Sequence, residues 1–117
     1  MSTRPTAIAT LVAIPLLFAA LASFAVRAEA VDAAAAETLI KKSKCGTCHS
    51  LDKKKEGPTY KETAKKYQGK DDARKKLFIH MTTSPKVKVD GKEETHDSPK
   101  TKSDDEIKNL VAWILSR

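Results

Sequence analysis

The sequence predicts a small all-α domain over residues 31–117. Four stretches combine good helix formers with one apolar face, which is typical of helices that pack on a shared core. Gly and Pro residues that end helices stand between these stretches. No pattern of parallel strands is present. We therefore expect about four helices and no large sheet.

The first two expected helices flank a polar segment. Asp32 is a good N-cap, and the helix that it starts should run to about Lys44. After the charged residues 52–56 comes Gly57-Pro58, a turn whose proline also suits the first position of a helix. We expect a short helix from there to Gly69.

The last two expected helices flank a long loop. One starts at Asp71 or Asp72 and is terminated by Pro85. Residues 82–102 show no convincing helix, and so long a loop in a small domain is usually functional. A small hairpin at residues 87–91 is one interpretation of part of it. The final helix is the clearest, because Ser103 to Glu106 reads as a capping box before apolar residues at helical spacing. These are Ile107, Leu110, Val111, Ile114 and Leu115, with Trp113 on the flank.

Residues 1–30 read as a secretory signal peptide rather than as part of the fold. Arg4 supplies the positive start, residues 7–26 are largely apolar, and Ala28-Glu29-Ala30 matches the cleavage rule. The competing interpretation is an uncleaved anchor, since about 20 apolar residues can cross a bilayer. We expect cleavage after Ala30, a periplasmic location and no stable membrane insertion afterwards.

The remaining 87 residues are basic and poor in large apolar side chains. Without Arg4, Arg27 and Glu29 they hold 20 Lys and Arg against 14 Asp and Glu, a net charge of +6. Only 16% are Leu, Ile, Val or Phe, which is below the roughly 20% under which charged chains tend to stay disordered. The polypeptide needs another apolar group to complete its core.

The motif Cys45-Gly46-Thr47-Cys48-His49 indicates what that group is. Its spacing lets two thiols add to the vinyl groups of one haem while the imidazole binds the iron. A redox dithiol would instead open a helix after a strand. A zinc site needs four ligands, and the only further histidines, His80 and His96, are at no recognised spacing. We expect one covalent haem c.

Together these features resemble a small bacterial class I cytochrome c over essentially all of residues 31–117. The shared features are the first helix, the Cys45–His49 motif, Gly57-Pro58, a loop with a sixth iron ligand, and a last helix ending in residues 111–115. The resemblance implies that the first and last helices cross and that the Pro58 carbonyl orients His49. It also implies an electron-transfer protein rather than an enzyme.

The chain departs from that family on the distal side of the haem. The family usually has an axial methionine in the loop before the last helix, about where this chain has His96, seven residues before Ser103. We therefore expect His96 to be the distal ligand. Met81 is the second candidate, although its helical apolar face also fits core filling, and His80 or an open site remain alternatives. Ligation by His49 and His96 would give a low potential, because a second imidazole favours ferric iron.

The charge predicts the kind of partner. Lys41, Lys42, Lys44 and residues 53–55 flank the motif and would steer an acidic redox partner, although any one of them is ordinary as a solvated lysine. Nucleic acid is not expected for an exported chain poor in aromatics, and we expect a monomer. Two other functions stay open: a haem-based small-gas binder or sensor, and an electron-accepting subunit of a periplasmic oxidoreductase complex.

Overall fold

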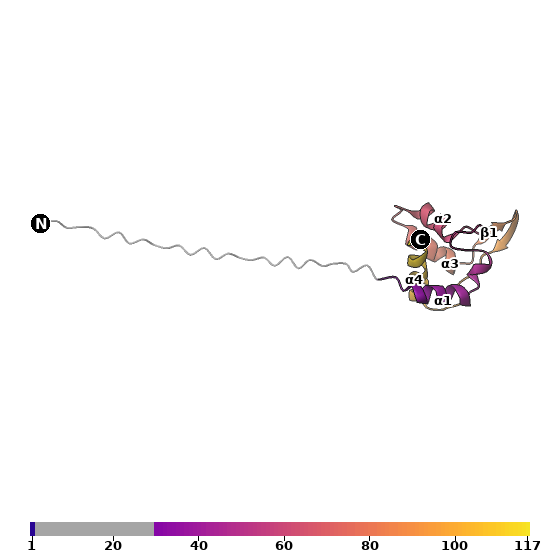
Figure 1. Cartoon of the computed structure of the whole chain (residues 1–117), viewed down its shortest axis with the longest axis horizontal. Helices are drawn as coiled ribbons and strands as arrows, with labels where there is room; N and C mark the ends of the chain where they lie inside the picture. The colour runs from indigo at the N-terminus through magenta and orange to yellow at the C-terminus, as the bar shows by residue number, and fades with distance from the viewer. Residues whose placement is uncertain (2–29) are drawn as a thin grey trace.

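The computed structural model describes Met1 and residues 30–117, so most of the expected signal peptide lies outside the described residues. The elements are α1 (Ala33–Lys42), the 3₁₀ helix η1 (Cys45–Thr47), α2 (Tyr60–Tyr67), α3 (Ala73–Thr82), β1 (Lys86–Val89), β2 (Lys92–Thr95) and α4 (Asp104–Leu115) (Figure 1). The four predicted helices are confirmed, and two short strands accompany them. In the part of the chain that the structure describes, no helix is long and apolar enough to cross a membrane.

Helix α4 is the centre of the packing. Helices α1, α2 and α3 each contact it, so the predicted pairing of the first and last helices is confirmed. Leu110 and Val111 of α4 are 1% exposed. Trp113, expected on the flank of this helix, is instead buried, because α2 covers that side with Tyr60. The core cluster comprises Ala36, Leu39, Tyr60, Leu77, Met81, Ile107, Leu110, Val111, Trp113 and Ile114.

The ends of the helices follow local capping chemistry. The Asp32 side chain accepts a hydrogen bond from the backbone N–H of Ala35, as the N-cap prediction requires. Helix α1 ends at Lys42, earlier than expected, since Lys44 adopts a left-handed conformation with φ of 58°. At the start of α4 only one half of the expected capping box forms: the Ser103 hydroxyl accepts a hydrogen bond from the N–H of Glu106.

The start of α2 differs from the prediction. Pro58 precedes the helix, and Thr59 is the N-cap. The Thr59 hydroxyl accepts from the Glu62 N–H at 3.0 Å, and the Glu62 carboxylate accepts from the Thr59 N–H at 2.8 Å. This reciprocal pair is a complete capping box, which fixes where α2 begins and leaves the Pro58 carbonyl outside the helix.

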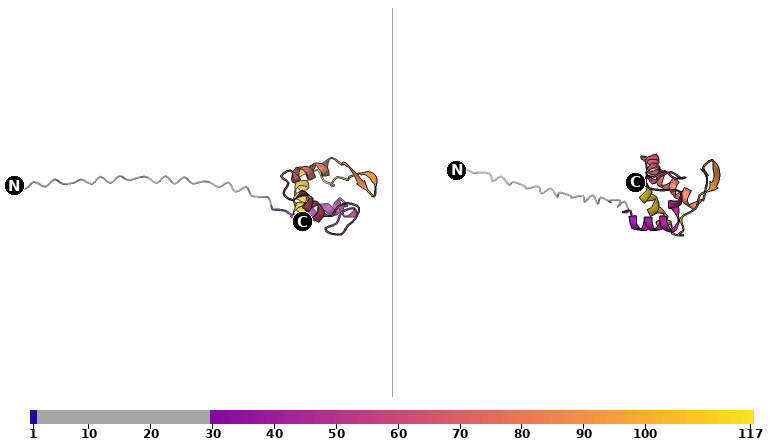
Figure 2. Two further views of the ribbon diagram at one scale, coloured as in Figure 1. Left: turned by 90° about the horizontal axis from the view of Figure 1, so that it is seen from above. Right: turned by 45° about the vertical axis from the view of Figure 1, so that its right-hand side comes forward.

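The long loop contains the small hairpin, and this prediction is confirmed. Strands β1 and β2 are antiparallel, and the turn between them uses Asp90 and Gly91 at φ of 49° and 78°, as a type I′ turn requires. Figure 2 shows the hairpin projecting beyond the helices. At its base the His96 N–H donates to the Pro85 carbonyl at 2.9 Å, and the hydroxyls of Ser84 and Ser98 lie 2.8 Å apart. These contacts tie the residues after the hairpin to the end of α3.

Candidate cofactor site

The two cysteines lie on a tight turn directly after α1. The left-handed Lys44 turns the chain into η1, and both Cys45 and Cys48 are half-buried free thiols. Burial raises the pKa of the Cys45 thiol. A hydrogen bond from the Cys48 thiol to the Glu56 carboxylate, 3.3 Å long, raises the pKa of Cys48. Because a reactive redox dithiol needs a lowered thiol pKa, the environment of this pair does not favour that alternative.

The zinc alternative receives no support from the geometry either. Within residues 30–117, no group of three or more His, Cys, Asp or Glu side chains is arranged to hold a metal ion. A structural zinc site needs four such ligands, and the side chains of the motif do not come together even as a group of three.

The imidazole of His49 is held from one side. Its Nδ1 lies 2.7 Å from the carbonyl oxygen of Pro58, and since a carbonyl only accepts, Nδ1–H is the donor. The lone pair of the neutral ring is then on Nε2, which is free to bind a metal. The backbone of Gly57 passes directly against the ring, where an added Cβ would lie 2.6 Å from Cε1 of His49. Only glycine fits there, a requirement that the Gly-Pro pair alone did not reveal.

His96 faces His49 although 46 residues separate them in the sequence. Their ring centroids are 6.0 Å apart and their planes are inclined by 52°. Two metal–nitrogen bonds of about 2 Å each, with about 1 Å from each nitrogen to its ring centroid, also span about 6 Å. The spacing therefore fits one metal ion between the rings.

The environment of His96 fits the same interpretation. Its Nδ1 is buried and has no hydrogen-bond partner among the described residues, which is unusual for a buried polar atom. Burial, followed by the nearby rings of His80 and His49, lowers the pKa of His96. The ring is therefore neutral near pH 7, the form in which an imidazole can bind a metal.

The other two distal candidates are placed differently. Met81 is 8% exposed and belongs to the core cluster, in keeping with its interpretation as core filling. His80 is half-buried in the last turn of α3, and its ring centroid lies 4.5 Å from that of His96. His80 is thus a neighbour of His96 rather than an isolated helix residue. The short distance between the rings of His80 and His96 could not be obtained from the sequence.

Two buried aromatic rings follow one another from His49 into the core. The Tyr60 ring is stacked at 5.9 Å from that of His49, and Trp113 meets Tyr60 edge-on at 5.3 Å. Burial raises the pKa of Tyr60 to about 12. Tyr60 of α2 thus packs between the imidazole and Trp113 of α4.

Comparisons with known proteins identify the family of the chain. A profile of the family "Cytochrome c" matches residues 33–117. Cytochrome c-552 of Hydrogenobacter thermophilus is 39% identical over 83 residues, covering 68% of this chain and 79% of that protein. Cytochrome c-551 of Pseudomonas aeruginosa is 35% identical over 81 residues, covering 69% and 75%.

Two solved structures are also similar. The class 1 cytochrome MtoD of Sideroxydans lithotrophicus superposes with a TM-score of 0.71 at 49% identity, covering 74% of this chain and 97% of that one. Cytochrome c552 of Nitrosomonas europaea gives a TM-score of 0.54 at 31% identity, covering 68% and 96%. The chain thus carries one covalent haem c and transfers electrons rather than acting as an enzyme, and it belongs to the cytochrome c family as a small bacterial class I member.

Proposed function

We propose that Cys45 and Cys48 hold the haem through thioether bonds and that His49 and His96 are its two axial ligands. The observation that carries this proposal is the 6.0 Å separation of the two imidazoles, which suits a single metal ion bound to both. Cys45 begins η1, and Cys48 follows η1 and directly precedes His49; both are free thiols. In this proposal the turn that carries Cys45, Cys48 and His49 and the loop that carries His96 hold the same haem.

The supports around each ligand are consistent with these roles. The Pro58 carbonyl accepts the Nδ1–H of His49 and fixes the orientation of the ring, and such a bond makes the imidazole a stronger donor to a metal. The hairpin base holds His96 through its N–H bond to Pro85. A ligand held in this way is suited to remain bound in both oxidation states, which favours a carrier over a gas sensor.

Two imidazole ligands would make the protein a low-potential carrier. The bound haem supplies one-electron redox chemistry, and the chain sets its potential and its access to partners. Imidazole donates more strongly than a thioether and stabilises ferric iron. With His49 and His96 both engaged, no coordination position remains for a substrate, and single-electron transfer is the activity that the arrangement supports.

We place the protein in the periplasm after removal of residues 1–30. The support is the apolar stretch of residues 7–26 followed by Ala28-Glu29-Ala30, together with a family match that begins at residue 33, just after the expected cleavage site. The expected monomer remains a prediction.

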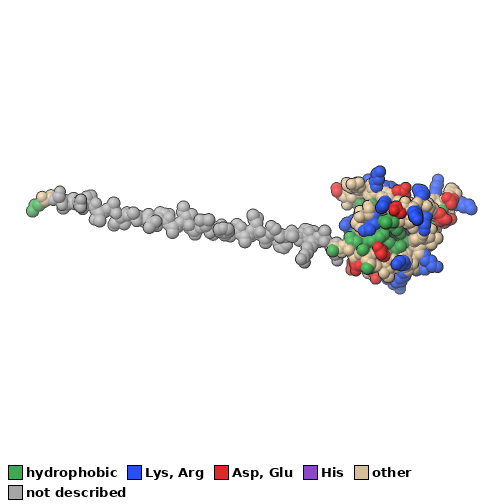
Figure 3. Space-filling model, in the orientation of Figure 1, with side chains coloured by type: hydrophobic (Ala, Val, Ile, Leu, Met, Phe, Trp, Pro, Cys, Tyr) green, Lys and Arg blue, Asp and Glu red, His purple; other side chains and the backbone are tan. Residues whose placement is uncertain are grey.

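The partner is proposed to present an acidic surface. Lys41, Lys42 and Lys44 are exposed beside the motif, as are the lysines at 53–55. Figure 3 shows Lys and Arg side chains spread around an apolar patch on the visible face. Positive charge near the motif would speed the encounter with an acidic protein, and screening over about 8 Å at physiological ionic strength would weaken this effect.

Spectroscopy of the oxidised protein tests the ligand assignment. We expect a low-spin paramagnetic resonance spectrum without the weak near-infrared band of methionine ligation. The reduced protein should bind carbon monoxide slowly, because His96 must leave first. A methionine band would exclude His96 as the ligand, and rapid carbon monoxide binding would favour the gas-binding alternative.

A further inference from the structure

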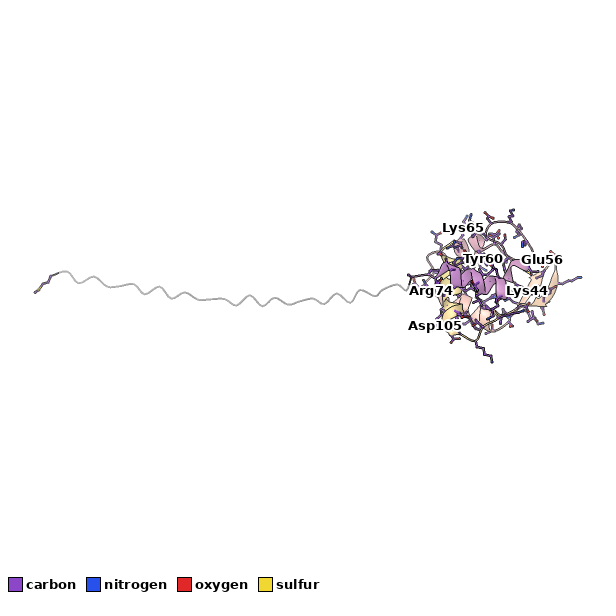
Figure 4. All side chains as sticks on the ribbon, turned by 60° about the horizontal axis from the view of Figure 1, so that its bottom comes forward. Lys44, Glu56, Tyr60, Lys65, Arg74 and Asp105 are labelled. Atoms are coloured by element: carbon purple, nitrogen blue, oxygen red, sulfur yellow. The ribbon has the colours of Figure 1, made fainter. Side chains whose placement is uncertain are left out.

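A polar hollow of about 510 Å³ lies between the end of α2, the turn into α3 and the end of α4. Five cationic side chains line it, and Asp71 is the only acidic side chain among its lining residues. The five are Lys61, Lys65, Lys70, Arg74 and Arg117. Figure 4 shows Lys65 and Arg74 toward one end of the folded body and Lys44 and Glu56, beside the cysteine motif, toward the other. Lys65 and Arg74 therefore lie away from the cysteine motif, whereas Arg117 also lines the pocket that contains His49.

Most of this positive charge is not neutralised by the protein. Lys61 forms an ion pair with Asp52 at 3.6 Å. Among the described residues, no carboxylate lies within ion-pair distance of Lys65, Lys70 or Arg74. Counting Asp71 and Asp52, the ion-pair partner of Lys61, as negative groups still leaves three net positive charges. Like charges gathered in a hollow repel one another, and a bound anion removes that repulsion.

Arg117 is already held in place for such a ligand. Its guanidinium lies 4.4 Å from the centroid of the Trp113 ring. Its Nε donates to the Trp113 carbonyl at 3.1 Å, and one Nη donates to the Ser116 hydroxyl at 3.0 Å. Both acceptors are neutral, so the charge of the guanidinium is left for another partner. An ordered Arg loses less side-chain entropy on binding, and its planar donors match the oxygens of a phosphate group.

We infer that this hollow binds a multivalent oxyanion of the phosphate type. Its volume falls in the range of about 300–1,000 Å³ that is usual for small-molecule sites. Its cationic side chains come from α2, the turn after it, α3 and the end of α4, and they surround a concave surface. Docking of a protein would instead use a broader, flatter face. Tyr67 is the only aromatic residue in the lining, which offers little stacking surface for nucleobases.

The test uses the mature haem-containing protein, reduced, with inorganic phosphate and tripolyphosphate as separate probes. Chloride at matched ionic strength serves as the reference. Binding is followed by calorimetry and by the nuclear magnetic resonance signal of the Trp113 indole, the single Trp of the chain. Because Arg117 lies over that ring, an anion in the hollow should shift the signal. We expect saturable binding, tighter for tripolyphosphate if the ligand carries several phosphate groups and equal for the two probes if one phosphate suffices.

Lys70→Gln/Arg74→Gln is the test variant, and Lys88→Gln/Lys92→Gln on the hairpin is its control. All four side chains are exposed, and both variants remove two positive charges. The test variant should lose about tenfold in affinity, equivalent to about 1.4 kcal/mol, while the control keeps the affinity of the original protein. Equal loss in both variants, or no binding beyond that in matched chloride, would overturn the inference. So would a test variant that slows only reduction by an acidic partner protein, since the hollow would then belong to a docking surface.

Discussion

Replacement of Gly57 by alanine would directly disturb His49, the proposed proximal ligand. The new Cβ would lie 2.6 Å from Cε1 and 2.8 Å from Nδ1 of His49, and 3.1 Å from the carbonyl of Cys48. Carbon atoms in favourable contact stay about 3.5 Å or more apart, so the ring must retreat by roughly 1 Å. The bond of 2.7 Å from Nδ1 to the Pro58 carbonyl would not survive that displacement.

The expected loss of stability follows from these contacts. The lost hydrogen bond contributes about 0.5–1.5 kcal/mol, and the overpacking of a close-fitting site costs about 1–3 kcal/mol. The sum is about 2–4 kcal/mol, and a domain of this size loses about 4–8 °C in Tm per kcal/mol. Gly57→Ala should therefore melt on the order of 10–30 °C lower. The midpoint potential should rise, because His49 becomes a weaker donor without its carbonyl partner.

Gly46→Ala is the matched control for this experiment. Gly46 lies between the two cysteines of the motif, and a Cβ added there would meet nothing within 4 Å. Thermal unfolding followed by circular dichroism, with redox titration of the same samples, compares the two variants. If Gly57→Ala melts within a degree or two of Gly46→Ala at the same potential, the close approach of Gly57 to His49 does not position the ring, and the reasoning fails.

Three further predictions concern the ligand, a cap and the cofactor. His96→Met should keep low-spin haem and raise the midpoint potential in a redox titration, whereas His96→Ala should bind carbon monoxide rapidly when reduced. Met81→Leu should leave the absorption spectrum unchanged, since it conserves volume in the core, and the opposite pattern would make Met81 the ligand. Thr59→Ala should lower the free energy of unfolding by about 1 kcal/mol in chemical denaturation, because it removes half of a capping box; an unchanged value would mean that solvent replaces the cap. The double variant Cys45→Ala/Cys48→Ala should be largely unfolded by circular dichroism, given the low content of large apolar residues, and native helix content without haem would contradict this.

The sequence specified the local features well. The spacing within Cys45–His49 depends on adjacent residues alone, so the motif proposed to attach the haem could be identified without a fold. The apolar period of α4 and the Asp90-Gly91 turn of the hairpin are local in the same sense, because propensity and turn chemistry act within a few residues. The Gly57-Pro58 turn predicts a helix after it, but Thr59 is the residue that caps α2.

Tertiary structure alone decided which of these elements meet. A helical period shows that one face of a helix is buried but not what covers the rest. The period of α4 therefore places Trp113 on a flank, although Tyr60 packs against it in the structure. The polar loop around His96 has no period, and its position opposite His49 depends on the Pro85 contact at the base of the hairpin. Gly57 must be glycine because a Cβ added there would lie 2.6 Å from the side chain of His49, eight residues earlier. Such distances depend on how the backbone folds back on itself, and residue order carries no direct record of them.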